Sequence, residues 1–268
     1  MQYDYNLSDL NSAYKKLNLK KNDVIYITGN LVALGKYSGK NILHDKLKVI
    51  QKILGKRCTI SFPTHSFRLI NNNKLIFDVK KTNSETGSFS EYLRKQKGCY
   101  RQFHPYSSTS SIGKHAKYIC SNNSRHVYGP DSPFDKLIKL NCKFIGFGLE
   151  PGYTAAQVHH LEYMQNVPYR YTKSFNQKIK YKNTIKQMEF YLFVMYKKFY
   201  KYKRDRNRKI FNNFKKKNHI NVVSIGKNKI YSYSLKDFYL STLDLIKKDP
   251  YCWLPDEVIK KYKLGKGS

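Results

Sequence analysis

The chain has 268 residues, of which 40% are hydrophobic, which is enough for one large domain or two small ones with a proper core. The 51 lysines and arginines outweigh the 18 aspartates and glutamates, so the net charge is +33. Such an excess attracts polyanions such as nucleic acid, phosphorylated metabolites or an anionic membrane. Lysine is abundant along the whole sequence, however, so a uniform compositional bias also explains the charge. We expect some of these cations to hold phosphate groups, and we do not expect nucleic acid as a partner.

Composition also argues against membrane, secreted and metal-binding classes. The most apolar window, residues 190–195, is far too short to cross a bilayer, and residues 1–5 lack the features of a signal peptide. The five cysteines lie far apart and form no CxxC pair, which argues against a zinc site and against a disulfide framework. We therefore expect a cytoplasmic protein without a bound metal.

The first part of the chain predicts a β-α-β unit. Residues 23–28 form an apolar strand, and a helix that begins near Asn41 keeps its apolar side chains on one stripe until Gly55 ends it. Residues 58–62 form a second strand, so a parallel and right-handed pairing is expected. The polar segment 74–89 predicts a loop.

Short elements follow in the middle of the chain. Helices are expected over residues 87–94, 112–120 and 135–140, and a buried strand over 143–148 ends in glycines. Residues 155–163 carry no helix breaker and predict another helix. In α/β units ligands bind beyond the carboxyl ends of strands, and this last helix begins in that region.

The residue composition changes in the last third of the chain. Residues 178–217 interleave basic with aromatic side chains, as nucleic-acid-binding patches do. The aromatic residues fit the buried side of a strand or helix with snorkelling lysines as well, and we favour this structural interpretation. Residues 221–225 and 229–233 predict a hairpin, after which Ser234 caps a final helix that ends near Asp249.

The first candidate for chemistry is the pair His159 and Glu162. On a helix these residues are i and i+3, so their side chains share a face and can touch. A carboxylate beside an imidazole fixes its tautomer and raises its basicity, as a general base requires. The same spacing also fits a surface His-Glu pair without chemistry. The neighbouring His160 points off the Glu162 face and ranks second.

Six sequence blocks, in order, resemble those of the antibiotic (aminoglycoside 3-N-) acetyltransferase family. They lie at residues 28–35, 62–66, 77–87, 101–108, 129–133 and 154–162. The first block keeps Leu-x-x-Leu-Gly but has Gly29 and Asn30 in place of serines, and the third has lost both prolines. The last block keeps Thr154, His159 and Glu162 of the motif Thr-x-x-x-x-His-x-x-Glu.

The resemblance implies an α/β fold of three α/β/α layers with a mixed, largely parallel central sheet, unrelated to the GNAT fold. It assigns residues 1–173 to a catalytic core that binds acyl-CoA. Residues 174–268 would complete the fold and the acceptor site. A homodimer stays open, as does the length of the acyl chain.

The resemblance further implies a coenzyme A-dependent N-acyltransferase, in which His159, oriented by Glu162, is the general base for direct attack by an amine. Acyl-CoA, acetyl-CoA or a longer one, is the implied cosubstrate, with no metal. The implied cofactor-binding residues are Asn30, Leu31, Gly35, Arg101, His104, Ser108 and Ser110. The implied substrate-binding residues are Thr64, His65, Asp78, Glu91 and Tyr169. For His104, followed by Pro105, a rigid turn with a structural imidazole is the alternative.

The acceptor is the most open part of this prediction. A chain at +33 is poorly suited to concentrate a polycationic aminoglycoside and suits an anionic acceptor. We therefore predict acyl transfer to the primary amine of a nucleotide-linked amino sugar, as in surface polysaccharide biosynthesis. An aminoglycoside is the alternative acceptor, and a basic nucleic-acid-binding protein is the alternative of another class. Arg170 and Tyr171, next to Tyr169, are expected to contact the acceptor.

Overall fold

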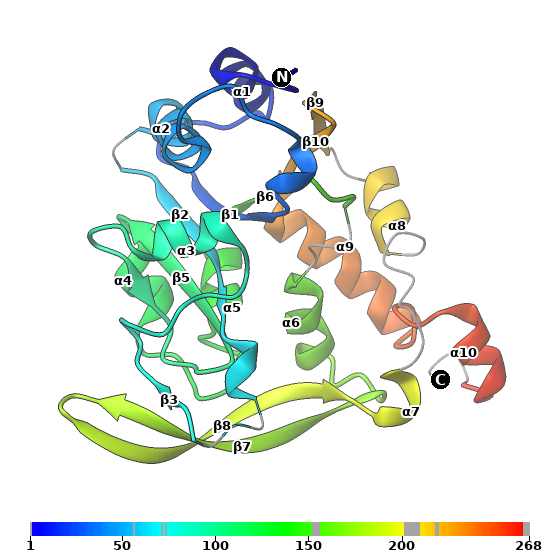
Figure 1. Cartoon of the computed structure of the whole chain (residues 1–268). Helices are drawn as coiled ribbons and strands as arrows, with labels where there is room; N and C mark the ends of the chain where they lie inside the picture. The colour runs from blue at the N-terminus through cyan, green and yellow to red at the C-terminus, as the bar shows by residue number, and fades with distance from the viewer. Residues whose placement is uncertain are drawn as a thin grey trace.

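Figure 1 shows a computed structural model of the chain, which describes residues 2–55, 57–70, 72, 74–151, 156–200, 210–217 and 220–264. A seven-stranded sheet forms its centre, with the strand order β4-β5-β2-β1-β6-β10-β9. The strands are β1 Val24–Gly29, β2 Thr59–His65, β4 Tyr100–Arg101, β5 Ser107–Gly113, β6 Lys143–Phe147, β9 Asn221–Ile225 and β10 Asn228–Ser234. The sheet is mixed, as expected. Its parallel part consists of the three central strands, since β1 pairs in parallel with β2 and β6 and the outer pairs are antiparallel.

Helices cover both faces of this sheet, which confirms the expected three layers. One face carries α1 Leu7–Lys15, α2 Ile42–Leu54 and α3 Ser88–Arg94. The other carries α4 Ala116–Cys120, α5 Pro133–Lys139, α6 Gln157–Met164, α8 Ile210–Lys217 and α9 Leu235–Lys248. Strand β1 contributes side chains to the hydrophobic cores on both faces of the sheet, because Ile25 and Ile27 pack on one side and Val24 and Tyr26 on the other. The short helices α7 Lys197–Tyr200 and α10 Asp256–Lys261 complete the described chain.

A second sheet lies along the lower side of the molecule in Figure 1. It has the order β3-β7-β8 and is built from β3 Ile76–Phe77, β7 Arg170–Tyr181 and β8 Thr184–Met195. Its buried side packs in a small separate cluster that includes Phe77, Ile179 and Phe190. The basic and aromatic run therefore begins in a hairpin with a buried side, and its residues 201–209 lie outside the described residues.

Local signals in the sequence predicted several element ends correctly. Asn41 caps α2, with its side-chain oxygen accepting a hydrogen bond from His44 N at 3.1 Å, and Gly55 ends the helix at φ +76°. The β9–β10 hairpin forms, and Ser234 caps α9 through Asp237 N at 3.2 Å. Strands β9 and β10 extend the central sheet, and the division near residue 173 stays a prediction.

Two expectations about secondary structure were wrong. Residues 112–120 are not one helix, because Ile112 and Gly113 end β5 and only Ala116–Cys120 is helical. The segment 74–89 is not all loop, because it contains β3 and the start of α3. Among the described residues, we find no helix that is both long and apolar enough to cross a membrane.

Candidate active site

The predicted pair forms on α6. His159 Nδ1 lies 2.5 Å from Glu162 Oε2, the imidazole is about a quarter exposed, and the carboxylate is fully buried. Tyr169 donates its hydroxyl hydrogen to Glu162 Oε1 at 2.6 Å, and Arg170 Nε lies 2.9 Å from Oε2. Both partners follow α6 closely in the chain, at the entry to β7. The helix thus leaves the imidazole partly exposed and buries the carboxylate that contacts it.

The charge of Glu162 determines what His159 can do. Burial acts to raise the pKa of this carboxyl, but the charges of His159 and Arg170 and the hydrogen bonds from His159 and Tyr169 outweigh it and lower the pKa to about 2. The group is therefore an anion at neutral pH. We assign the imidazole proton to Nδ1, because Nδ1 faces the Glu162 carboxylate, which can only accept a hydrogen bond. Nε2 is then able to take a proton.

His65 and Tyr128 come from other elements to the neighbourhood of His159. His65 ends β2, and burial lowers its pKa to about 4, with the charges of Arg101 and His159 acting in the same direction. Its Nε2 lies 3.2 Å from Ser107 Oγ. The Tyr128 ring lies 6.1 Å from the His159 ring. Nothing in the sequence pointed to Tyr128, which lies about thirty residues from His159 in the chain.

The Arg101 to Ser110 residues that the resemblance assigned to cofactor binding are buried. Arg101 donates from Nη1 to Thr82 O at 2.5 Å, from Nη2 to Thr64 O at 2.6 Å and from Nε to Ser108 Oγ at 2.8 Å. The Thr64 hydroxyl lies 2.8 Å from Ser110 Oγ, and both residues have no exposed surface. Since these groups bind each other, they act in the structure as positioning residues for the ends of β2 and β5. Their direct contact with coenzyme A stays a prediction.

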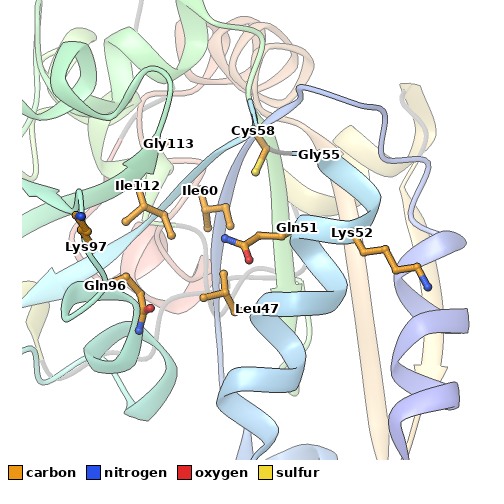
Figure 2. Close-up of a pocket in the computed structure, with 10 residues that line it drawn as sticks. All are labelled: Leu47, Gln51, Lys52, Gly55, Cys58, Ile60, Gln96, Lys97, Ile112 and Gly113. Carbon is orange, nitrogen blue, oxygen red and sulfur yellow. The ribbon is translucent and has the colours of Figure 1, made fainter.

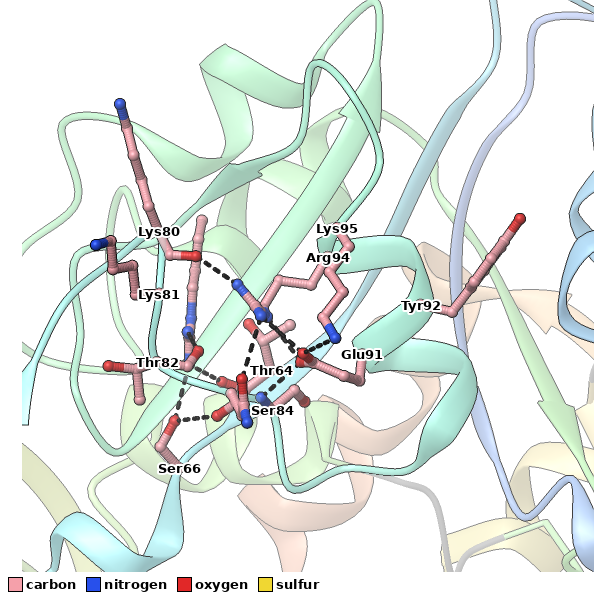
Figure 3. A network of polar contacts seen from close by, with 12 residues as sticks. Thr64, Ser66, Lys80, Lys81, Thr82, Ser84, Glu91, Tyr92, Arg94 and Lys95 are labelled. Carbon is pink, nitrogen blue, oxygen red and sulfur yellow. Dashed lines mark hydrogen bonds and ion pairs between the residues drawn. The ribbon is translucent and has the colours of Figure 1, made fainter.

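Two carboxylates expected to bind substrate stabilise the loop between β3 and α3, and Figure 3 shows the contacts of Glu91. Glu91 pairs with Arg94 at 2.7 Å and accepts a hydrogen bond from Ser84 N at 2.8 Å. Although burial opposes it, the hydrogen bonds from Arg94 and Ser84 and the Arg94 charge lower the pKa of Glu91 to about 2. Asp78 accepts a hydrogen bond from Lys80 N at 2.8 Å and so closes a turn. A substrate role for either carboxylate stays a prediction.

His104 and His160, the two further histidines that the sequence singled out, have structural surroundings. His104 Nδ1 accepts hydrogen bonds from Tyr106 N and Ser107 N, both at 3.3 Å, which is the rigid turn given as the alternative. Burial lowers its pKa to about 3, although the Tyr191 carbonyl acts in the opposite direction. His160 is buried too and accepts a hydrogen bond from Gly129 N at 3.3 Å. His159 is therefore better placed than either to meet a substrate.

The early loop borders a cavity of about 300 Å³ that could hold part of a cosubstrate. Asn30 and Leu31 line it, together with Phe147 and the first residues of α3. No side chain caps α3, so its first backbone N–H groups are open to a polar ligand. Gly35 does not line this cavity, and its positive φ of +94° lets the loop pass Asp4, where a Cβ would be 2.4 Å from a carboxylate oxygen.

A larger cavity of about 560 Å³ lies at the start of β2 (Figure 2). Its lining includes Cys58 just before the strand, Ile60 near its start and Gly113 at the end of β5. His65 is at the opposite end of β2, so this cavity is not part of the site around His159.

Comparison with known proteins places these features in a family. A sequence model described as aminoglycoside 3-N-acetyltransferase matches residues 29–247. The chain belongs to this family. A search of curated proteins found no match. The aminoglycoside 3-N-acetyltransferases are acetyl-CoA-dependent N-acetyltransferases, so the chain is a coenzyme A-dependent N-acyltransferase with an acyl-CoA as cosubstrate.

Solved structures support the fold of the family. Aminoglycoside acetyltransferase AAC(3)-Xa is 15% identical, with a TM-score of 0.77 over 90% of this chain and 92% of that one. A structure described as AAC-IIIb binary with CoASH is 16% identical, with a TM-score of 0.77 over 91% and 96%. YokD protein from Bacillus subtilis is 17% identical, with a TM-score of 0.74 over 90% and 98%. At these identities the likeness concerns the fold alone.

The aminoglycoside acetyltransferase motifs therefore divide into two sets in this chain. The His-x-x-Glu motif gives a dyad with a partly exposed imidazole and a buried carboxylate, whereas the block from Arg101 to Ser108 is mostly buried. Arg170 and Tyr169 contact Glu162, while Tyr171 is partly exposed and stacks on Tyr196. Their contact with the acceptor stays a prediction. Among the described residues, no cluster of three or more His, Cys, Asp or Glu side chains could hold a metal ion.

Proposed function

We propose that the protein transfers an acetyl group from acetyl-CoA to a primary amine of an aminoglycoside, with His159 as the general base. The observation that carries this proposal is the partly exposed His159 imidazole, bound through Nδ1 to a buried carboxylate. Membership of the aminoglycoside 3-N-acetyltransferase family supports the class of acceptor. The predicted cytoplasmic location fits an enzyme that draws on acetyl-CoA.

The proposed reaction is a direct transfer. The amine nitrogen attacks the thioester carbonyl, the new N–C bond forms, and His159 Nε2 takes the proton that the nitrogen loses. The C–S bond then breaks, and the coenzyme A sulfur leaves as a thiolate that gains a proton. Glu162 holds the imidazole in the productive tautomer and offsets the positive charge that it acquires. Placing amine and thioester together would supply much of the acceleration.

A nucleotide-linked amino sugar is the second candidate acceptor. The net charge of +33 favours an anion over a polycation. The carboxylates that the sequence assigned to the site are each already near a cation: Glu162 with Arg170, Glu91 with Arg94, and Asp78 with Lys180 at 3.9 Å. These pairings leave them less able to attract ammonium groups. The family nevertheless gives the aminoglycoside the stronger support.

A thiol-release assay tests the proposal and separates the two acceptors. Purified protein and acetyl-CoA are mixed with an aminoglycoside, with an amino sugar linked to a nucleoside diphosphate, or with the N-acetylated form of each as matched control. We expect free coenzyme A to appear with the aminoglycoside and not with its acetylated form. Release with the sugar nucleotide alone would favour the second candidate. No amine-dependent release with either acceptor would contradict the proposed function.

A further inference from the structure

The turn of the long hairpin carries a concentration of positive charge, which we call the basic arm and define as residues 178–187. It contains four lysines and no acidic residue, and all four lysines are exposed. They are Lys178, Lys180, Lys182 and Lys186. The nearest described carboxylate contact is Asp78, 3.9 Å from Lys180. In Figure 1 the turn between β7 and β8 reaches past the rest of the molecule.

The arm also exposes aliphatic side chains beside its lysines. Ile185 is 60% exposed and pairs across the hairpin with Lys180. Ile76 of β3 is 42% exposed and pairs with Lys178 on the other side of β7. Since side chains alternate along a strand, these residues share the outer face of the sheet, opposite to buried Ile179. An exposed face that mixes lysines with isoleucines suits a surface that is anionic outside and apolar just below.

We propose that the basic arm docks on an anionic phospholipid membrane surface. The lysines would meet lipid phosphates, and Ile185 would enter the boundary between headgroups and acyl chains. This role lies beyond acetyl transfer and does not depend on it. Lys180 is ten residues along β7 from Arg170, which corresponds to about 33 Å of extended strand, so a docked arm would leave the dyad clear of the membrane.

Features of the arm favour lipid over nucleic acid. It carries no arginine, the residue that recognises phosphates with two parallel hydrogen bonds. Its aromatic residue Tyr181 packs edge-on against Phe103 at 5.8 Å, and Lys182 and Lys186 each lie 5.9 Å from its ring centre. A ring in these contacts is less free to stack on bases, as single-stranded nucleic acid requires. The aliphatic Ile185 beside the turn is more exposed, at 60%, than Tyr181 at 43%.

Co-sedimentation with vesicles tests this proposal. The full chain is mixed with phosphatidylcholine vesicles with and without phosphatidylglycerol. We expect binding to the anionic vesicles alone, weakened by salt. Changing Lys178→Gln, Lys180→Gln and Lys182→Gln together should reduce binding at least about tenfold, because each lysine near an anionic surface contributes to the affinity. Ile185→Ser alone should reduce it about threefold or more.

A matched variant controls for the high charge of the whole chain. Lys15→Gln, Lys16→Gln and Lys20→Gln remove the same charge from exposed lysines in and just after α1, which Figure 1 places at the opposite side of the molecule. This variant should bind within about twofold of the unchanged protein. Equal losses in both triple variants, full binding by Ile185→Ser, or no vesicle binding would overturn the proposal. Tighter binding to single-stranded RNA, lost in the arm variant, would overturn it in favour of nucleic acid. Melting curves check that each variant folds.

Discussion

At the scale of single residues, Glu162 has two roles that must be separated in any experiment. It orients His159, and it also compensates Arg170, whose side chain is almost completely buried. Removing the carboxylate would leave the guanidinium without its counter-charge, so Glu162→Gln is expected to destabilise the fold as well as slow the reaction. Tyr169, which donates one hydrogen bond to the same carboxylate, allows a cleaner test.

Tyr169→Phe should lower kcat about fivefold and leave the KM for acetyl-CoA unchanged. The change removes one hydrogen bond to Glu162, worth about 1 kcal/mol, and alters no residue placed near the cosubstrate. Steady-state kinetics of thiol release measure both constants. Tyr3→Phe is the matched control, since Tyr3 is exposed and has no assigned role in the site, and it should keep kcat within about twofold. Equal kcat values for the two variants would remove Tyr169 from the set of positioning residues.

Lys46→Met should raise the melting temperature. The Lys46 ammonium is fully buried on α2, 3.0 Å from the centre of the Phe147 ring, and it has no hydrogen-bond partner among the described residues. Burial lowers its pKa well below the usual value of 10.5, so the wild-type chain loses stability as pH falls below 10.5. The gain from methionine, about 1 kcal/mol or more, should therefore be larger at pH 7 than at pH 10.

Calorimetry at both pH values measures this difference. Lys48→Met on the same helix is the control, because Lys48 is exposed and should change the melting temperature little. A lower melting temperature for Lys46→Met at pH 7 would show that the contacts of the ammonium with Phe147 and Phe89 outweigh its burial.

At the scale of elements, the buried Arg101 acts as a clamp between chain segments. Its guanidinium joins the ends of β2 and β5 to the loop that carries Thr82. Arg101→Lys should lower the free energy of unfolding by about 2–4 kcal/mol, because one ammonium cannot reach the carbonyls of Thr64 and Thr82 together. Arg68→Lys is the control: Arg68 is half exposed and paired with Glu85, and it should cost less than about 1 kcal/mol.

Urea unfolding gives the stability of both variants, and acetyl-CoA titration gives their affinity for the cosubstrate. A loss of acetyl-CoA affinity in Arg101→Lys with unchanged stability would support the contact with coenzyme A that the sequence predicted. A loss of stability in that variant alone supports the clamp.

Elements with local signals could be predicted, and those held by distant contacts could not. Helix α2 has an apolar stripe, Asn41 before it and Gly55 after it, all visible within one stretch of sequence. Strand β5 begins Ser-Ser-Thr-Ser-Ser, and three of its four serines can be buried because they bind Thr64, Ser61 and Arg101 from other segments. The i, i+3 spacing predicted the contact of His159 with Glu162, whereas the turn that brings Tyr169 and Arg170 to the carboxylate has no comparable signal.

At the scale of the whole molecule, the three layers gather the site from segments far apart in the chain. Strand β2 ends at His65, α6 presents His159, and the entry to β7 supplies the partners of Glu162. The net charge of +33 says less about the site, because the basic residues are spread over the whole chain. The carboxylates Glu91 and Glu162 are paired with arginines. The proposed activity therefore depends above all on the His159 imidazole as general base.

The most direct test of this claim is amine-dependent thiol release from acetyl-CoA by His159→Ala. We expect this variant to lose a factor of roughly 10² to 10⁴ in turnover at neutral pH, which is the usual contribution of a general base to the rate. Its melting temperature should stay close to that of the unchanged protein. His44→Ala, at an exposed position on α2, should retain full turnover. Near-full turnover by His159→Ala would contradict the account and make His65 the next candidate for the base.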